Sequence, residues 1–202
     1  MKNHFLILAI VGVFTCSTAS ADNVEQIQKM VVKAETFCGQ FNQQRYLSGI
    51  KRTINSSGRF CVDSRKGILW RTQNPYKSTM KITGNEIVQY SGDRLVSRMS
   101  AQKQPAVKVL HNILFSLSSG DLSPLQHYFT VNTTVNQSYW HATLIGKNSS
   151  AGMVMKRIDV EGDKYVRHLV MEEKNGDRMN IFFSEFSTGH GALMPEDRAF
   201  YE

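Results

Sequence analysis

The sequence lacks the short motifs that mark the common classes of enzyme. It contains no Gly-x-Ser-x-Gly elbow, no phosphate-binding P-loop and no dinucleotide-binding fingerprint. The adjacent acids Glu172 and Glu173 do not form a catalytic pair, because successive residues of a strand point to opposite faces. We therefore expect a protein that is not an enzyme, and an esterase-like hydrolase is the weakest of three functional hypotheses.

Metal-ligand spacing and nucleic-acid-binding motifs are also missing. The histidines after the N-terminal segment are dispersed, and no two of them have the spacing of a zinc site. The 24 basic and 17 acidic residues give a net charge of +7, but the basic residues are scattered and follow no recognition motif. We expect no metal, no cofactor and no nucleic acid. The positive charge instead suits anionic lipid headgroups or an acidic partner.

Beyond the N-terminus, no stretch is apolar enough to cross a membrane. Lys2 precedes an apolar run over Phe5–Phe14, and small residues follow up to Ala21, which is the pattern of a cleavable secretory signal peptide. The sequence thus predicts a signal peptide over residues 1–21 and a single exported domain over residues 22–202. A lipid anchor at Cys16 is the alternative, although bulky Phe14 and Thr15 precede that cysteine.

The chain is poor in cysteine, and signal cleavage leaves only Cys38 and Cys61 of the three. An even number of cysteines in an exported chain favours a disulfide, with two buried free thiols as the alternative. One antiparallel register of Thr36–Tyr46 with Ile54–Asp63 places the two cysteines opposite each other on one face. The same register gathers apolar residues on the other face, with Phe37 opposite Val62, Gly39 opposite Phe60 and Phe41 opposite Gly58. This agreement favours a Cys38–Cys61 disulfide.

Short apolar runs separated by turn residues predict antiparallel strands. The stretch from Gly58 to Asp93 contains four such turns, and its runs alternate between an apolar face and a mostly wet face. Four further strands are predicted over Tyr139–Ile145, Met153–Val160, Tyr165–Glu173 and Arg178–Phe186.

Three segments have helical rather than strand periodicity, over Val24–Glu35, Gln102–Leu117 and Leu125–Tyr128. Because these helices interrupt a chain of strands, we expect them to lie across the sheet. The fold class is therefore α+β and mainly β: a single curled antiparallel sheet of roughly nine to eleven strands that forms an unclosed β-barrel, lidded by short helices. No structure is predicted for residues 187–202.

The order of these elements resembles the LolA-like carriers of outer-membrane lipoproteins. The matching features are an N-terminal helix, a Phe-x-x-x-Phe-x-Gln strand over Phe37–Gln43, a Gly-x-Phe strand, and a strand ending in Leu69-Trp70 before Pro75. Four segments are closer to a divergent LolA-like branch than to the main carrier: Gly67–Thr72, Ser78–Thr83, Leu117–Leu122 and Glu172–Asp177. The resemblance covers nearly all of the mature chain.

The resemblance implies an apolar cavity for acyl chains beneath the helices. Ile68 and Trp70 match cavity-lining positions of the family, and Phe37 and Phe41 match its first-strand phenylalanines. The residues that we expect to bind lipid are Phe37, Phe41, Phe60, Val62, Ile68, Trp70, Met80, Ile82, Leu110 and Leu114. The main carrier couples lid to barrel through an Arg-Pro pair before the Trp strand. Here Arg65 is adjacent to that position and the proline is missing, so another lipid is as good a candidate cargo as a lipoprotein.

The resemblance further implies a periplasmic monomer that takes acyl-chain cargo from an inner-membrane donor protein and passes it to an outer-membrane acceptor. The alternative hypothesis is a non-enzymatic envelope assembly factor whose barrel is packed and which binds a protein partner. Both hypotheses use the same apolar residues, because a curled sheet either fills its interior with side chains or holds a ligand there.

Overall fold

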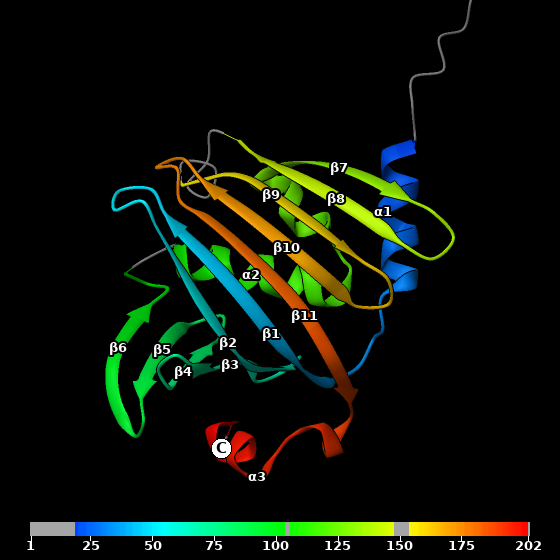
Figure 1. Cartoon of the computed structure of the whole chain (residues 1–202). Helices are drawn as coiled ribbons and strands as arrows, with labels where there is room; N and C mark the ends of the chain where they lie inside the picture. The colour runs from blue at the N-terminus through cyan, green and yellow to red at the C-terminus, as the bar shows by residue number, and fades with distance from the viewer. Residues whose placement is uncertain (1–18, 104–105, 148–153, 202) are drawn as a thin grey trace, which may run out of the picture.

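The computed structural model describes residues 19–103, 106–147 and 154–201, and these form one curled antiparallel sheet with helices against it (Figure 1). The sheet has eleven strands in the order β6-β5-β4-β3-β2-β1-β11-β10-β9-β8-β7. Because β6 and β7 are its two edges, the sheet is not closed, and the predicted fold class is confirmed. The strands are β1 Thr36–Leu47, β2 Arg52–Asp63, β3 Gly67–Asn74, β4 Ser78–Ile82, β5 Glu86–Ser91, β6 Arg94–Ser100, β7 Phe129–Val135, β8 Trp140–Gly146, β9 Met155–Gly162, β10 Val166–Glu173 and β11 Arg178–Thr188.

The predicted pairing of the first two strands is present residue for residue. Cys38 lies opposite Cys61, with Phe37 opposite Val62 and Phe41 opposite Gly58. The Sγ atoms of Cys38 and Cys61 are 2.13 Å apart, which is a disulfide-bond distance. The apolar face and the cysteine face were therefore assigned correctly from the alternation of side chains.

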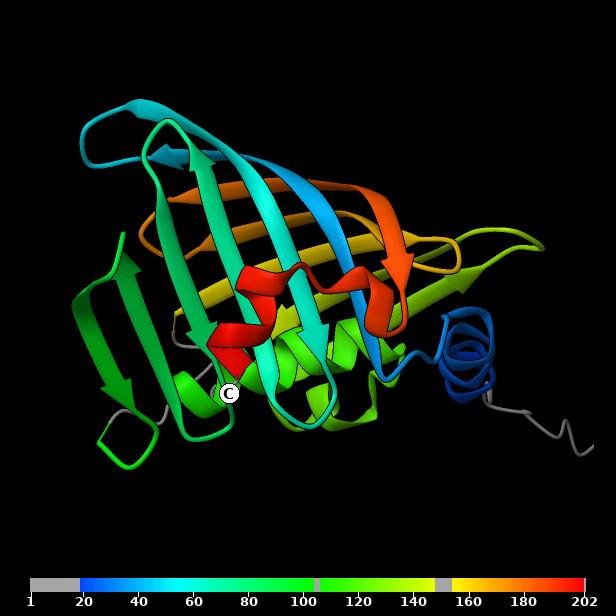
Figure 2. The same ribbon diagram turned by 90° about the horizontal axis from the view of Figure 1, so that it is seen from below.

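Helix α2 (Ala106–Ser119) lies on the concave side of the sheet, and the 3₁₀ helix η1 (Ser123–His127) follows it (Figure 2). Ile113 and Leu117 of α2 are buried in the same core as the inner residues of the strands. Gly120 ends the helix with a φ of +71°, and a Cβ atom there would lie 2.9 Å from Val31. Only glycine satisfies both the left-handed backbone and this close contact.

Helix α1 (Ala19–Met30) covers the edge strand β7, where the Asn23 side chain donates a hydrogen bond to the Thr133 carbonyl at 3.0 Å. This helix ends earlier than the predicted Glu35. The backbone N–H of Val32 donates to the Lys164 carbonyl, 2.9 Å away in the β9–β10 turn, instead of continuing the helix. Residues 1–18, with most of the predicted signal peptide and Cys16, lie outside the described residues.

Two strands differ from the prediction. No strand was assigned between Phe129 and Tyr139, where β7 lies, because its polar-rich sequence Phe-Thr-Val-Asn-Thr-Thr-Val masks the alternation of buried and exposed positions. Strand β9 begins at Met155, and the predicted start at Met153 is outside the described residues.

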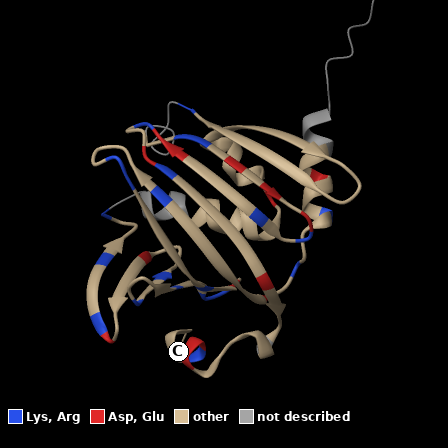
Figure 3. Cartoon of the chain, in the orientation of Figure 1, with Lys and Arg blue, Asp and Glu red and all other residues tan. Residues whose placement is uncertain are grey.

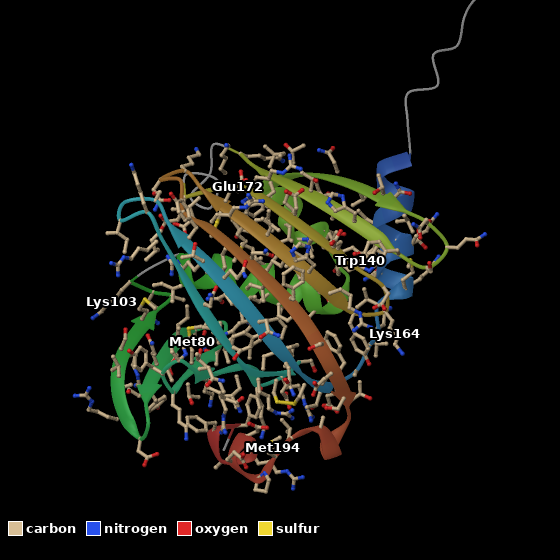
Figure 4. All side chains as sticks on the ribbon, viewed as in Figure 1. Met80, Lys103, Trp140, Lys164, Glu172 and Met194 are labelled. Atoms are coloured by element: carbon tan, nitrogen blue, oxygen red, sulfur yellow. A yellow bond between two sulfur atoms is a disulfide. The ribbon has the colours of Figure 1, made fainter. Side chains whose placement is uncertain are left out.

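The C-terminal tail, for which the sequence predicted no structure, folds onto the outer face of β1, β2 and β3 (Figure 2). It contains the 3₁₀ helix η2 (His190–Ala192) and helix α3 (Pro195–Tyr201). Leu193 and Tyr201 pack against the two cysteines, which are almost completely buried between the sheet and the tail segment that carries Met194 (Figure 4). The prediction that this face is mostly wet is therefore wrong at the end of the sheet that the tail covers.

One buried carboxylate fixes the tail to the sheet. Arg59 and Arg71 lie directly opposite each other on β2 and β3, an arrangement in which like charges repel. Asp197, with 1% of its surface exposed, lies 3.5 Å from Arg59 Nε and 3.4 Å from Arg71 Nε. Its Oδ2 atom also accepts the Met194 backbone N–H at 3.0 Å, which caps the start of α3.

Tyr201 closes the end of the tail. Its hydroxyl donates to the carbonyls of Cys61 and Gly67, at 3.0 and 3.3 Å. Burial raises the pKa of Tyr201 well above its usual value, so the hydroxyl keeps its proton as a donor.

We predict that Asp197→Ala lowers the free energy of unfolding by about 3 kcal/mol, because it leaves two facing arginines without their shared anion. The same variant should speed reduction of the Cys38–Cys61 disulfide by dithiothreitol, since the tail covers both sulfurs. Urea denaturation and thiol-trapping mass spectrometry measure the two effects. The matched control is Glu196→Ala, whose side chain is 55% exposed and should change stability by less than about 0.5 kcal/mol. Unchanged reduction kinetics in Asp197→Ala would show that the tail does not shield the disulfide.

A second prediction concerns His111 on α2. Its ring lies 4.2 Å from that of Phe115, and burial lowers the pKa of His111 from its usual 6.5, against a smaller opposing effect of Asn112. Below pH 6.5 the unfolded chain therefore binds the proton more readily than the folded one, and stability falls as the pH falls through the lowered pKa. The melting temperature should drop further between pH 7.5 and pH 5.5 in the natural protein than in His111→Gln. Equal drops in the two proteins would refute this assignment.

Candidate functional site

A small apolar cavity lies between the concave face of the sheet and helix α2. Its volume is about 60 Å³, and it is enclosed by side chains from β1, β2, β3, β10, β11 and α2. The lining residues are Phe37, Phe60, Val62, Ile68, Trp70, Leu114, Leu117, Ser118, Tyr165, Val166, Leu169, Phe183 and Phe186.

Six of the ten residues expected to bind lipid line this cavity: Phe37, Phe60, Val62, Ile68, Trp70 and Leu114. Phe41 is not among the lining residues, but its ring stacks on that of Trp70, with 4.0 Å between the ring centroids. Met80 and Ile82 belong to the same apolar core beside the cavity. Leu110 is in α2, but its side chain lies outside the part of the chain that the structure describes.

A further part of the wall comes from β10 and β11, which the sequence analysis did not connect with the site. Phe183 and Phe186 both face the cavity although they are three positions apart, where simple alternation would place them on opposite faces. The pairing of β1 with β11 shifts between Cys38 and Gln40, and Glu185 has a φ of +51° at this bulge. The extra residue turns Phe186 back to the inner face, where it stacks on Tyr165 at 4.2 Å.

Aromatic rings dominate the wall, and Phe60 lies at their centre. Its ring centroid is 5.2 Å from that of Phe183 and 6.1 Å from those of Phe37 and Phe186, all in edge-to-face contact. The described lining residues include no carboxylate, imidazole or amine. The Ser118 hydroxyl is occupied by a hydrogen bond to the Phe115 carbonyl at 2.9 Å. This wall offers a surface for apolar groups, and among its described residues only Tyr165 and Ser118 carry a side-chain hydroxyl.

A groove of about 280 Å³ leads toward the cavity at one end of α2. It runs between residues 32–35, which connect α1 to β1, and the helix positions Phe115 and Ser119. Phe37, Val62 and Ser118 line both the groove and the cavity, so the two are neighbours. The groove is therefore the candidate entrance.

Arg65, the predicted lid residue, lies near this groove rather than at the centre of the lid. Its guanidinium forms an ion pair with Glu35, a groove residue, and the adjacent Ser64 N–H donates to the Glu35 carbonyl at 2.9 Å. Because both side chains of the ion pair are exposed, the pair contributes at most about 1 kcal/mol. A contact of this strength stabilises the position of residues 32–35 against the β2–β3 turn only weakly.

The cavity is smaller than a lipid. Pockets that hold small molecules usually measure about 300–1,000 Å³, several times the 60 Å³ of this cavity. Binding of a long apolar ligand therefore requires α2 or the side chains of the wall to move outward.

Two other features bear on function. Cys38, Cys61 and Asp197 are close enough to resemble a metal site, but the two sulfurs are bonded to each other and leave no thiolates as ligands. Among the described residues, no helix combines the length and apolar character that a membrane span needs.

The comparisons with known proteins agree with this architecture. The family model for the outer membrane lipoprotein carrier protein LolA matches residues 32–193. No curated protein matches the sequence. A LolA superfamily protein from Nitrosomonas europaea has a similar solved structure, with a TM-score of 0.50 and 7% identity over 92% of this chain and 98% of the other.

A putative outer membrane lipoprotein-sorting protein domain from Vibrio parahaemolyticus aligns with a TM-score of 0.48 and 10% identity, over 88% of this chain and 96% of the other. The family model spans both the strands and the helix that enclose the cavity. The chain therefore belongs to the LolA family of outer membrane lipoprotein carrier proteins.

Proposed function

We propose that this protein is a carrier that shelters acyl chains of a lipoprotein or of another lipid and moves them toward the outer membrane. The observation that carries the proposal is the apolar cavity under α2 in a chain of the LolA family. An acyl chain in water is unfavourable by about 0.8 kcal/mol per CH₂ group, so a carrier must surround it with apolar side chains. The aromatic wall and the neighbouring groove supply such surroundings once α2 moves outward.

The proposed location is the periplasm, with residues 1–21 as a signal peptide and residues 22–202 as the mature domain. A disulfide at Cys38 and Cys61 supports this location, because disulfides persist in oxidising compartments. We propose that the carrier works as a monomer, receives cargo from an inner-membrane donor protein and delivers it to an outer-membrane acceptor. These partners follow from the family, and no reaction is proposed.

The second candidate is an envelope assembly factor that binds a protein instead of a lipid. The observation in its favour is that the cavity is small, so that most of the interior is packed with side chains. The two candidates differ in what the purified protein carries.

Native mass spectrometry of the protein from the periplasm, followed by lipid extraction, separates them. We expect stoichiometric adducts that contain acyl chains. A clean mass with no uptake of added fatty acid or lipopeptide would instead favour the assembly factor.

We predict that Leu114→Glu abolishes fatty-acid uptake, because it places a carboxylate on the cavity wall, where burial of a charge is strongly unfavourable. Trp70 fluorescence on titration with a fatty acid measures uptake, and circular dichroism checks the fold. The matched control is Ile145→Glu, which adds the same charge at a 38% exposed position on β8 and should leave uptake unchanged. Normal uptake by folded Leu114→Glu would show that the cavity is not the binding site.

A further inference from the structure

A second hollow lies on the outer face of the sheet, away from the cavity. It is a groove of about 430 Å³, within the usual range for small-molecule sites. Strands β1, β2, β3 and β11 meet there, beyond the part of the outer face that the C-terminal tail covers. Asn42, Gln44, Asn55, Ser57, Asn74 and Phe182 are among its lining residues.

The strand register arranges these residues in rows. Asn42 is paired with Phe182 on one side and with Ser57 on the other, and Ser57 is paired with Asn74. Gln44 lies opposite Asn55 in the next row, which is closer to the turn between β1 and β2. Asn42 and Gln44 alternate with the inward residues and share a face with Cys38, so these rows lie on the outer surface. The groove is thus built on paired strands, which hold its side chains at fixed spacing.

Phe182 forms an aromatic wall at one end of the row. Phe182 is 48% exposed, so one face of its ring is open to a ligand. Its ring stacks on the His168 ring at 4.3 Å with an angle of 4° between the planes. His168 is itself held by Glu161, at 2.9 Å from Nδ1, and by Asn180. These contacts fix the orientation of the Phe182 ring on the side away from Asn42.

None of the described residues that line the groove is charged, although β1 and β11 carry charged residues near their ends (Figure 3). Asparagine and glutamine each offer both hydrogen-bond donors and an acceptor. Asn74 donates to Ser57 at 3.2 Å, whereas the amides of Asn42, Gln44 and Asn55 make no hydrogen bond to another described residue. The described residues of the groove therefore present free hydrogen-bond donors and acceptors. They offer no counter-ion to a phosphate, carboxylate or amine ligand.

We propose that this outer groove binds a neutral carbohydrate. Sugar hydroxyls both donate and accept hydrogen bonds, as side-chain amides do, and the apolar C–H face of a sugar ring packs against an aromatic ring. Neutral amides beside one ordered aromatic ring are complementary to that chemistry. The site is separate from the cavity and does not depend on the carrier function proposed above.

The experiment is a titration of the ¹⁵N-labelled mature protein with two neutral trisaccharides, maltotriose and chitotriose, followed by NMR shift changes. We expect shifts confined to the groove strands with at least one of them, at concentrations up to about 20 mM, as for a dissociation constant near 1 mM. Trigalacturonic acid, a charged trisaccharide of similar size, should bind at least about tenfold more weakly, because the groove offers it no cation.

Phe182→Ala should weaken binding about tenfold, because it removes the apolar wall. Because Phe182 is 48% exposed, the variant should keep its fold. The matched control is Ile145→Ala, another partly exposed apolar residue of the outer face, which should bind as the natural protein does. Three results would each overturn the proposal: no shifts with either neutral sugar, shifts located at the cavity residues, or equal binding of the charged sugar. Lipid uptake measured on the same samples reports on the carrier function separately.

Discussion

The structure depends on the need to fill the concave side of one curled sheet. A sheet that curves without closing leaves an inner face that must be covered by helices, side chains or a ligand. Here α2 covers the opening, and the ring of Phe60 is the point at which the rings of β1, β3 and β11 converge. The small cavity beside Phe60 is the space that this packing leaves over. Because the cavity is small, a long apolar ligand would fit only if α2 or the side chains of the wall moved outward.

The two faces of β1, β2 and β3 contact different parts of the molecule. Trp70 faces the cavity, while its neighbour Arg71 faces outward to Asp197 and the tail. The tail therefore stabilises, from the outer face, strands that contribute to the cavity wall. The entrance groove and Arg65 lie at the end of these strands where Tyr201 binds Gly67, but the ion pair of Arg65 with Glu35 is exposed and weak.

The alternation of side chains along strands and the periodicity of helices were enough to predict the elements whose faces follow these two patterns. The β1–β2 register followed from requiring Phe37 and Phe41 on one face and the cysteines on the other. Leu114 was found on the cavity because helical periodicity places it with the inward side of α2. The cavity residues of β11 were not found, because the bulge at Glu185 breaks the alternation by which strand faces are read. The tail was missed because Asp197 acquires its role only when Arg59 and Arg71 are already paired. A family resemblance supplied the cavity itself, which no alternation pattern distinguishes from a filled core.

The pairing of β1 with β11 has a consequence for how the chain is made. Gln40 and Glu185, which contact each other across this pair, are 145 residues apart. At a synthesis rate of 5–20 residues per second, β11 is synthesised roughly 7–30 s after β1. During that time a strand rich in phenylalanine has one open edge, which is the kind of surface that promotes aggregation. The second edge of β1 is therefore covered only after synthesis has reached β11, which begins at Arg178.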